Sequence, residues 1–258
     1  LPRAAEFKRV LVPDGSFILN IKEHAENGQR HPYVIRLREA LCVELGWLCV
    51  DEFIWDKANW APGWWPNRFP DGWEHLYHFT KSRRFKMNQE AVLLPIGDWV
   101  KERLANLSEK DRKRQESGTG SGIGGNLSNS EGKEWVLPSN VLHFATECGN
   151  KRHSAAFPVS LPRFFIKLFS DEGDTVLDSF SGSGTTGVAC KQLGRSFVGV
   201  ETDAEQVTKA EKRCAKASYD PKWQTVVETT PTRPSARSGA DSGVLPFDFP
   251  LADFLAQH

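Results

Sequence analysis

The sequence predicts an α/β fold in which helices cover both faces of a sheet. Short apolar runs typical of strands alternate with amphipathic helical stretches along most of the 258 residues, as in layered α/β proteins. In addition, residues 175–201 read as a strand, a glycine-rich turn, a helix and a second strand, and the two strands end in Asp178 and Glu201. A chain of this length can bury a full core as one domain with insertions.

Hydrophobic periodicity predicts the individual elements. Helical spacing indicates helices over 4–12, 32–45, 98–107, 161–169 and 203–217. Apolar or alternating runs indicate strands over 16–20, 47–55, 73–80, 140–144, 176–177, 197–200 and 224–228. Pro32 suits the first turn of its helix, Gly46 suits a C-cap, and Asp203 suits an N-cap.

Composition divides the chain into four parts, with bounds at 1–80, 81–139, 140–228 and 229–258. The first part is one half of the sheet, and the third carries the glycine-rich turn. The second is interpreted as a basic insertion, because residues 81–114 contain ten Lys or Arg against five Asp or Glu. The Gly/Ser/Asn run at 117–132 should be a mobile loop. The last part is a linker with an apolar tail.

Charge and cysteine usage exclude several classes of protein. The 33 basic and 33 acidic residues balance, so any basic surface must be local. Five scattered cysteines without a CxxC pair indicate reduced, intracellular thiols rather than disulfides or zinc. The histidines show no metal-ligand spacing, and we assign no metal. No apolar run reaches membrane-spanning length, so no membrane association is expected.

The glycine-rich turn leaves two cofactor classes to compare. Gly182, Gly184 and Gly187 spell G-x-G-x-x-G, and Glu201 follows about twenty residues later, as in proteins that bind NAD. However, a carboxylate at Asp178 has no use beside a pyrophosphate. A dinucleotide unit also normally opens its sheet, whereas only one further strand is predicted after Glu201. These features favour S-adenosylmethionine, which has an ammonium group and no pyrophosphate, while an NAD-dependent oxidoreductase remains an alternative.

Four segments carry a family resemblance. Residues 178–186 read D-x-F-x-G-x-G-T-T, and this motif resembles the cofactor motif of the class-β DNA amino-methyltransferases, which modify N4 of cytosine or N6 of adenine. Three more segments match this family in the same order: the helix-PDG-strand segment at 9–20, the Trp55 to Asn59 block with residues 74–82, and His153 to Pro158, where Ser154 replaces the usual proline.

The resemblance implies a Rossmann-like methyltransferase sheet in the permuted, class-β motif order, with S-adenosyl-L-methionine as cofactor. By this likeness Phe157 and Pro158 lie near the methionine end of the cofactor, and Asp178 accepts from its ammonium group. Phe180, Gly182 and Gly184 wrap around it, Thr185 and Thr186 bind its carboxylate, and Glu201 binds the ribose hydroxyls.

The resemblance also implies double-stranded DNA as the partner. The family's target-recognition region corresponds to the basic insertion, and the residues expected to contact phosphates are Lys81, Arg83, Arg84 and Lys86. The 117–132 loop would become ordered on DNA. A homodimer is compatible with the family, and the expected location is the cytoplasm or nucleoid, or the nucleus in a eukaryote.

The family's catalytic tetrad, [D/S/N]-P-P-[Y/W/F], does not occur in the 258 residues. In class-β order we expect it upstream of Leu1; Asp220-Pro-Lys-Trp223 lacks the second proline and is rejected as catalytic. The tryptophan-rich segment and residues 146–150 favour N4 of cytosine as the target, and N6 of adenine is the alternative. A non-catalytic DNA-binding relative is a further alternative.

Overall fold

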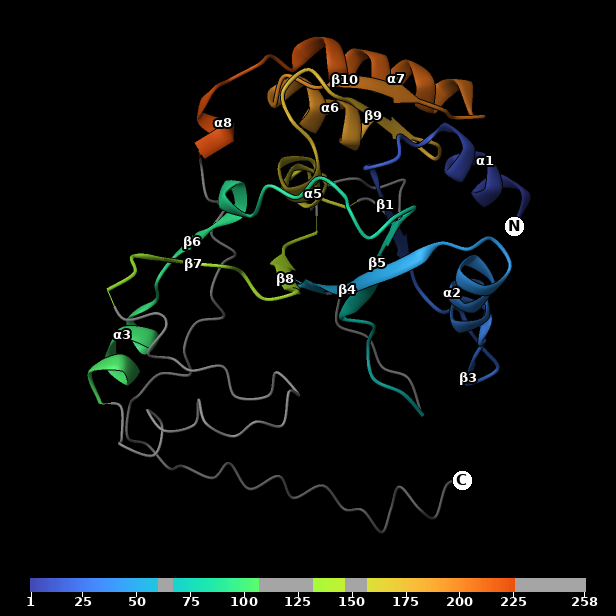
Figure 1. Ribbon diagram of the computed structural model, residues 1–258. Coiled ribbons are helices and arrows are strands. Elements are labelled where there is room, and N and C mark those ends of the chain that lie inside the picture. Colours follow the sequence, from blue (N-terminus) through green and yellow to red (C-terminus); the bar gives the residue numbers. More distant parts are fainter. Residues whose placement is uncertain (60–66, 107–131, 147–156, 226–258) are drawn as a thin grey trace.

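The computed structural model describes residues 1–59, 67–106, 132–146 and 157–225. Its largest sheet contains β1 (Ser16–Ile21), β4 (Leu48–Lys57), β5 (Trp73–Thr80) and β8 (Val141–Phe144) in the order β1-β5-β4-β8 (Figure 1). Because β5 is antiparallel to both of its neighbours and β8 is parallel to β4, β1, β4 and β8 all run in one direction.

A second, smaller sheet follows from the glycine motif. β9 (Thr175–Asp178) and β10 (Ser196–Gly199) are parallel, and α6 (Thr185–Gln192) connects them. This is the strand, turn, helix and strand that the sequence predicts. The two remaining strand pairs are short and antiparallel: β2 (Ala25–Glu26) and β3 (Gln29–Arg30) form a hairpin, whereas β6 (Leu94–Pro95) pairs with the distant β7 (Trp135–Val136).

Contacts after β5 place the start of β9 near the start of β1. Thr80, the last residue of β5, pairs with Ser16 and Leu48, the first residues of β1 and β4. Lys86 follows shortly afterwards, and its Nζ lies 2.6 Å from Oδ2 of Asp174, which directly precedes β9. We call this side the amino edge. The ends of β1, β4 and β8 lie at the opposite side, the carboxyl edge of the large sheet. The ring of Phe180, which follows β9, lies 6.5 Å from the ring of Phe7, and Phe7 packs on Phe17 at the start of β1.

Helices cover both faces of the large sheet, as the sequence predicts. Along β5, Tyr77 and Phe79 face one way and pack in a buried cluster with residues of α2 (Tyr33–Val43), while α1 (Pro2–Val10) packs around its margin. Leu76 faces the other way and packs with Phe165 and neighbouring residues of α5 (Ser160–Phe169). This alternation of side chains is the period of a strand that is buried on both faces.

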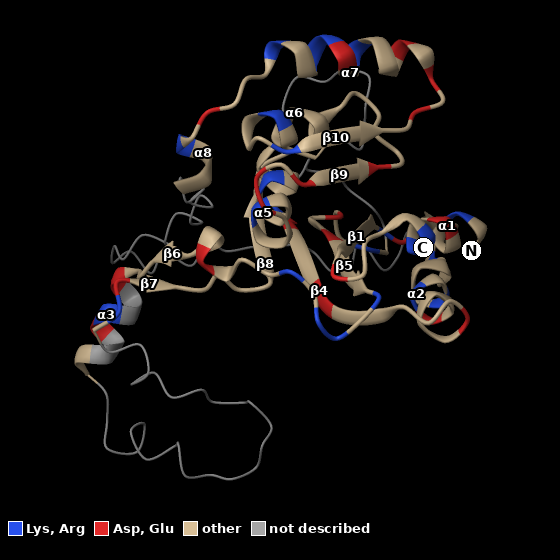
Figure 2. Cartoon of the chain, turned by 45° about the horizontal axis from the view of Figure 1, so that its top comes forward, with Lys and Arg blue, Asp and Glu red and all other residues tan. Residues whose placement is uncertain are grey.

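A third cluster joins α5 to the smaller sheet. Ile166 of α5 packs with Ala189 and Cys190 of α6, and Phe197 of β10 borders them. α7 (Ala204–Lys216) lies over α6, and its outer surface carries interspersed basic and acidic residues (Figure 2). Asp203 is its N-cap, because its carboxylate accepts from the Glu205 N–H at 2.8 Å. The cap expected from the sequence is confirmed.

Two local predictions are wrong. The strand expected at 224–228 is replaced, over its described part, by the short helix α8 (Lys222–Thr225). Asp220 accepts from the Lys222 N–H, and Trp223 packs its ring 3.7 Å from the Arg163 guanidinium, so a helical turn suits this segment better than an extended strand. Pro32 is the N-cap residue of α2 rather than part of its first turn.

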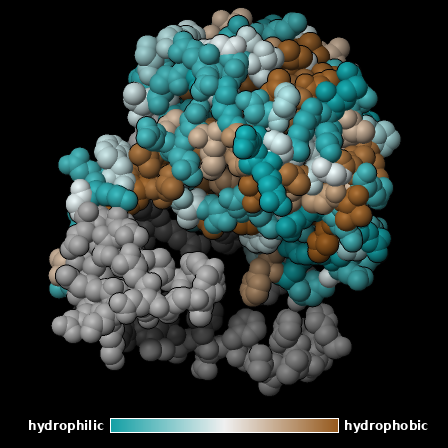
Figure 3. All heavy atoms as spheres, viewed as in Figure 1, coloured by the Kyte–Doolittle hydropathy of each residue, from teal (hydrophilic) through white to brown (hydrophobic). Residues whose placement is uncertain are grey.

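The described parts of the basic insertion hold η1 (Gln89–Val92), β6, α3 (Asp98–Ala105) and β7. η1 packs on α5, and its Val92 lies in the buried cluster that contains Leu76 and Phe165. The expected mobile loop lies outside the described residues apart from Gly132, and so does the tail at 229–258. On the face drawn in Figure 3, hydrophobic residues form separate groups among hydrophilic ones. None of the described helices is long and apolar enough to cross a membrane.

Candidate functional site

The glycine-rich turn follows the end of β9 and enters α6. Gly182 and Gly184 both have left-handed backbone angles, with φ of +48° and +80°, which glycine adopts without steric cost. Their surroundings differ. A Cβ on Gly184 would lie 2.8 Å from Cβ of Ala210 on α7, whereas a Cβ on Gly182 would meet nothing within 4 Å. Gly184 therefore allows helix packing, and Gly182 presents bare backbone to an approaching ligand.

Asp178 is held in place by the turn that follows it. One carboxylate oxygen accepts from the Phe180 N–H at 3.1 Å, and the other accepts from Oγ1 of Thr186 at 2.6 Å. These two contacts fix the direction of the carboxylate. A half-buried, oriented anion at the end of β9 is suited to bind a cationic group.

The two threonines at the start of α6 are buried. Thr186 donates its hydroxyl hydrogen to Asp178, and Oγ1 of Thr185 accepts from the Arg213 guanidinium at 3.2 Å. The Thr186 hydrogen is thus used within the protein, whereas the Thr185 hydroxyl accepts and keeps its hydrogen to donate. The backbone N–H groups at this helix start also suit a ligand carboxylate.

Arg213 is a site residue that the sequence did not reveal. It projects from α7, and its Nη1 donates to the Ser183 carbonyl at 3.0 Å and to the Ser183 hydroxyl at 2.7 Å, as well as to Thr185. It fixes the turn and brings a positive charge beside it. In the sequence Arg213 is one of several basic residues on a surface helix, and no spacing distinguishes it.

Glu201 follows β10 and closes the site from the second strand. Oε2 accepts from the Gly182 N–H at 2.9 Å, while Oε1 accepts from the N–H groups of Thr202 and Asp203 at 2.7 and 3.0 Å. These hydrogen bonds, from Asp203 and Thr202 first, hold the pKa of Glu201 below its usual value. The carboxylate is therefore ionised at neutral pH and tied to the glycine turn.

Aromatic and apolar groups border the site. The Phe180 side chain is 66% exposed, and its ring lies 6.5 Å from that of Phe7 on α1, with the Arg3 guanidinium 5.8 Å from its centroid. Phe157 and Pro158 lie just before α5. Pro158 is buried, and Phe157 packs against the buried cluster that contains Leu76 and Phe165. Residues 153–156 of the same motif lie outside the described residues.

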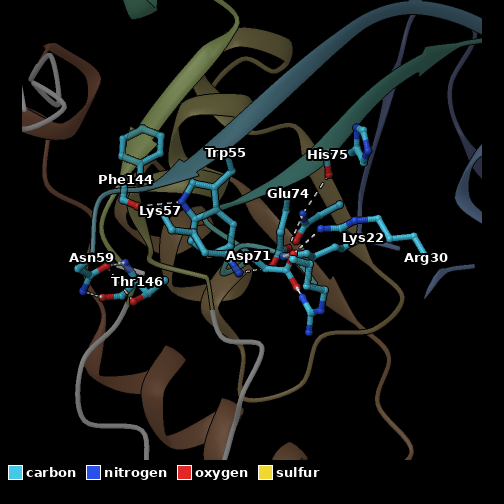
Figure 4. Close-up of polar contacts among 12 residues, drawn as sticks. Lys22, Arg30, Trp55, Lys57, Asn59, Asp71, Glu74, His75, Phe144 and Thr146 are labelled. Carbon is cyan, nitrogen blue, oxygen red and sulfur yellow. Dashed lines mark hydrogen bonds and ion pairs between the residues drawn. The ribbon is translucent and has the colours of Figure 1, made fainter. Parts of the chain in front are cut away.

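Polar side chains at the ends of β1, β4 and β8 extend the carboxyl edge (Figure 4). Asn20 of β1 donates to Oε2 of Glu74 at 3.0 Å, and Glu74 also lies 2.5 Å from Nζ of Lys57. The buried indole of Trp55 donates to the Phe144 carbonyl at 2.8 Å.

Beyond the ends of these strands, Asn59 Oδ1 accepts from the N–H and the hydroxyl of Thr146, at 2.6 and 2.9 Å. The Trp55 to Asn59 motif of the sequence thus joins the ends of β4 and β8 (Figure 4).

The residues expected to contact DNA phosphates lie at the amino edge of the large sheet. Lys81 donates to the Leu11 carbonyl, and Lys86 makes ion pairs with Asp171 and Asp174. These pairs raise the pKa of Lys86 above its usual value. Arg83 and Arg84 are exposed nearby. A phosphate contact at these four residues stays a prediction, and Lys81 and Lys86 also have structural partners.

The fold and site together define an α/β protein with a nucleoside-cofactor turn: an oriented acid after one strand, open backbone at a glycine, and a second acid after the neighbouring strand. Among the described residues, no three His, Cys, Asp or Glu side chains are grouped to hold a metal ion.

Comparison with known proteins gives the family. A family model described as DNA methylase matches residues 1–212. The chain belongs to this DNA methylase family.

Curated relatives agree with this assignment. The chain is 28% identical over 217 residues to the Type II methyltransferase M.PvuII of Proteus hauseri, covering 76% of this chain and 64% of that protein. It is 30% identical over 183 residues to M1.MboII of Moraxella bovis, covering 65% of this chain and 63% of that protein. The match thus spans just under two thirds of the length of these relatives.

Solved structures share the fold. The PvuII DNA methyltransferase (cytosine-N4-specific) has a TM-score of 0.54 at 20% identity, covering 83% of this chain and 68% of that one. The complex of M1.HpyAVI with SAM has a TM-score of 0.53 at 20% identity, covering 83% and 80%. The expected Rossmann-like α/β sheet of a class-β methyltransferase is confirmed.

Proposed function

We propose that this protein is an S-adenosylmethionine-dependent DNA methyltransferase that acts on an exocyclic amino nitrogen. The observation that carries the proposal is the pair of acids, Asp178 and Glu201, which follow β9 and β10 on either side of an open glycine turn, in a chain of the DNA methylase family. An acid beside the turn suits an ammonium group and disfavours a pyrophosphate.

The residues of the turn fit S-adenosylmethionine group by group. The Asp178 carboxylate would accept from the ammonium group, and the first N–H groups of α6 would donate to the carboxylate. Glu201 would accept from the ribose hydroxyls while keeping its bond to Gly182. Phe157, Pro158 and Phe180 would supply apolar contact near the methionine end. When bound, the cofactor supplies an electrophilic methyl group.

The catalytic tetrad is proposed to lie on a strand between the two sheets. Among the described residues, β9 pairs only with β10 and β1 pairs only with β5, so each has one free edge. A strand added between the two sheets would satisfy the backbone groups of the edge that it meets. A tetrad at the end of that strand would lie beside the glycine turn, where it would hold the amino group of a flipped base.

The target base is proposed to be cytosine, at N4. The support is the tryptophan-rich segment together with the similarity to the PvuII enzyme, whose solved structure is described as cytosine-N4-specific. N6 of adenine is the alternative. Mass spectrometry of duplex DNA after incubation with the enzyme and cofactor distinguishes N4-methylcytosine from N6-methyladenine.

Calorimetric titration of the 258-residue chain with S-adenosylmethionine and with NAD tests the cofactor assignment. We expect binding of S-adenosylmethionine alone, and binding of NAD alone would overturn the proposal. Asp178→Ala should abolish this binding while the protein stays folded. Asp220→Ala is a matched control, because it removes a carboxylate that accepts a backbone N–H at the start of α8, apart from the turn, and it should leave the affinity unchanged.

A further inference from the structure

Arg213 of α7 reaches the glycine-rich turn with one nitrogen atom. Its Nη1 lies 3.0 Å from the Ser183 carbonyl oxygen, 2.7 Å from Oγ of Ser183 and 3.2 Å from Oγ1 of Thr185. The two contacts with Ser183 hold the guanidinium in place, and the third joins it to the first residue of α6. Ala210, one turn earlier on α7, packs against Gly184 between them. The helix α7 therefore holds Arg213 directly against the turn.

The direction of these hydrogen bonds leaves the Thr185 hydroxyl with an unused hydrogen. A guanidinium group only donates, so Oγ1 of Thr185 accepts from Arg213. Within the described residues this hydroxyl donates to no other group, although Thr185 is only 7% exposed. A buried donor without an acceptor lowers stability. The turn therefore favours a ligand that supplies an acceptor at this point.

The neighbouring threonine is engaged in the opposite sense. Thr186 donates to Oδ2 of Asp178 at 2.6 Å, so one hydroxyl contacts an acid and the other contacts a base. The turn thus has an acceptor side at Asp178 and a donor side at Thr185, where the first N–H groups of α6 have no partner within the helix. The amino-acid end of S-adenosylmethionine carries the complementary pair, an ammonium group and a carboxylate.

We propose that Arg213 is a positioning residue for the carboxylate of the cofactor. This inference rests on the proposed function. By donating to the Thr185 oxygen, Arg213 directs the hydroxyl hydrogen away from itself and toward the carboxylate, which the first N–H groups of α6 also bind. Arg213 also occupies the Ser183 carbonyl, an alternative acceptor for that hydrogen. The site consequently selects adenosyl ligands with an intact amino-acid group over ligands that lack the carboxylate.

The first test is calorimetric titration with S-adenosylmethionine and with its decarboxylated form, which keeps the ammonium and sulfonium groups. Arg213→Gln should weaken binding of S-adenosylmethionine about tenfold, the effect of one lost hydrogen bond to a charged group. The affinity for the decarboxylated ligand should change by less than about twofold. Arg213→Lys keeps the charge but not the fork of donors, and it should show a smaller loss that is again confined to S-adenosylmethionine.

Lys212→Gln is the matched control for this titration. It removes one positive charge from the neighbouring position of α7, where the side chain is exposed. In the part of the chain that the structure describes, Lys212 makes no contact with the turn. We expect unchanged affinity for both ligands in this variant.

The second test asks whether Arg213 acts through Thr185. Thr185→Val removes the hydroxyl with little change of shape, and Thr185→Ser keeps it. The double variant Thr185→Val/Arg213→Gln should bind S-adenosylmethionine no more weakly than Thr185→Val alone, because two residues that act through one hydrogen bond have losses that do not add. Thr185→Ser should keep most of the affinity. If Arg213→Gln does not fold in urea-unfolding controls, Arg213→Lys replaces it in both tests.

Equal weakening of both ligands in Arg213→Gln would give Arg213 a structural role alone and overturn the proposal. Additive losses in the double variant, or an equal effect of Lys212→Gln, would also overturn it. The proposed function survives these results as long as the wild-type protein binds S-adenosylmethionine. If the wild-type protein binds NAD in its place, the function and this proposal fail together.

Discussion

Alanine substitutions at Gly182 and Gly184 distinguish a glycine that is needed for helix packing from one that is needed for ligand binding. Gly182→Ala and Gly184→Ala both place an alanine at positive φ, which costs about 1 kcal/mol in each case. Only Gly184→Ala also creates a clash, because its Cβ would lie 2.8 Å from Cβ and 2.9 Å from Cα of Ala210. A clash with backbone cannot be relieved by side-chain rotation, and overpacking of this kind costs about 2 kcal/mol more.

The expected losses of unfolding free energy are therefore about 3 kcal/mol for Gly184→Ala and about 1 kcal/mol for Gly182→Ala. Urea unfolding followed by tryptophan fluorescence and by circular dichroism measures both. In calorimetry, Gly182→Ala should weaken S-adenosylmethionine binding by about tenfold or more, equivalent to about 1.4 kcal/mol, because its methyl group occupies the open face. Equal stability of the two variants, or full cofactor affinity in Gly182→Ala, would refute this division of roles.

Three further perturbations test the interior and the amino edge. Burial lowers the pKa of His78 from its ordinary value of 6.5 to about 4. Between these two pH values His78 takes up a proton in the unfolded chain but not in the folded protein. The free energy of unfolding should therefore fall by about 3 kcal/mol between pH 6.5 and pH 4. In His78→Gln this part of the pH dependence, measured by urea unfolding at each pH, should disappear. Arg195→Met should cost about 3 kcal/mol, because the buried guanidinium donates to two carbonyls and a hydroxyl; a loss below about 1 kcal/mol in the same assay would contradict that estimate. Lys86→Met should cost about 1 kcal/mol, since its two ion pairs are partly exposed. The phosphate contact predicted from the sequence also requires this variant to show a smaller slope of log K against log salt in DNA binding, and an unchanged slope would contradict that contact.

Local patterns in the sequence were sufficient for much of the fold. The alternation in 73–80 predicts β5 with its bounds, and the periodicity of 161–169 predicts α5 to within one residue. Such segments are predictable because their burial follows the period of a single element. At 224–228 the same reasoning failed, since the ring of Trp223 packs on Arg163, a residue about sixty positions earlier in the chain.

The sequence by itself determined the glycine turn, its two acids and the family resemblance, because these lie within residues that are neighbours in the chain or follow a fixed order. The tertiary structure decided which glycine packs against α7 and which faces a ligand, since this depends on Ala210. It also brought Arg213 to the turn and gathered Lys22, Arg30 and Arg68 around Asp71. Charge neighbourhoods of this kind arise from the pairing of distant strands and loops, which local periodicity does not encode.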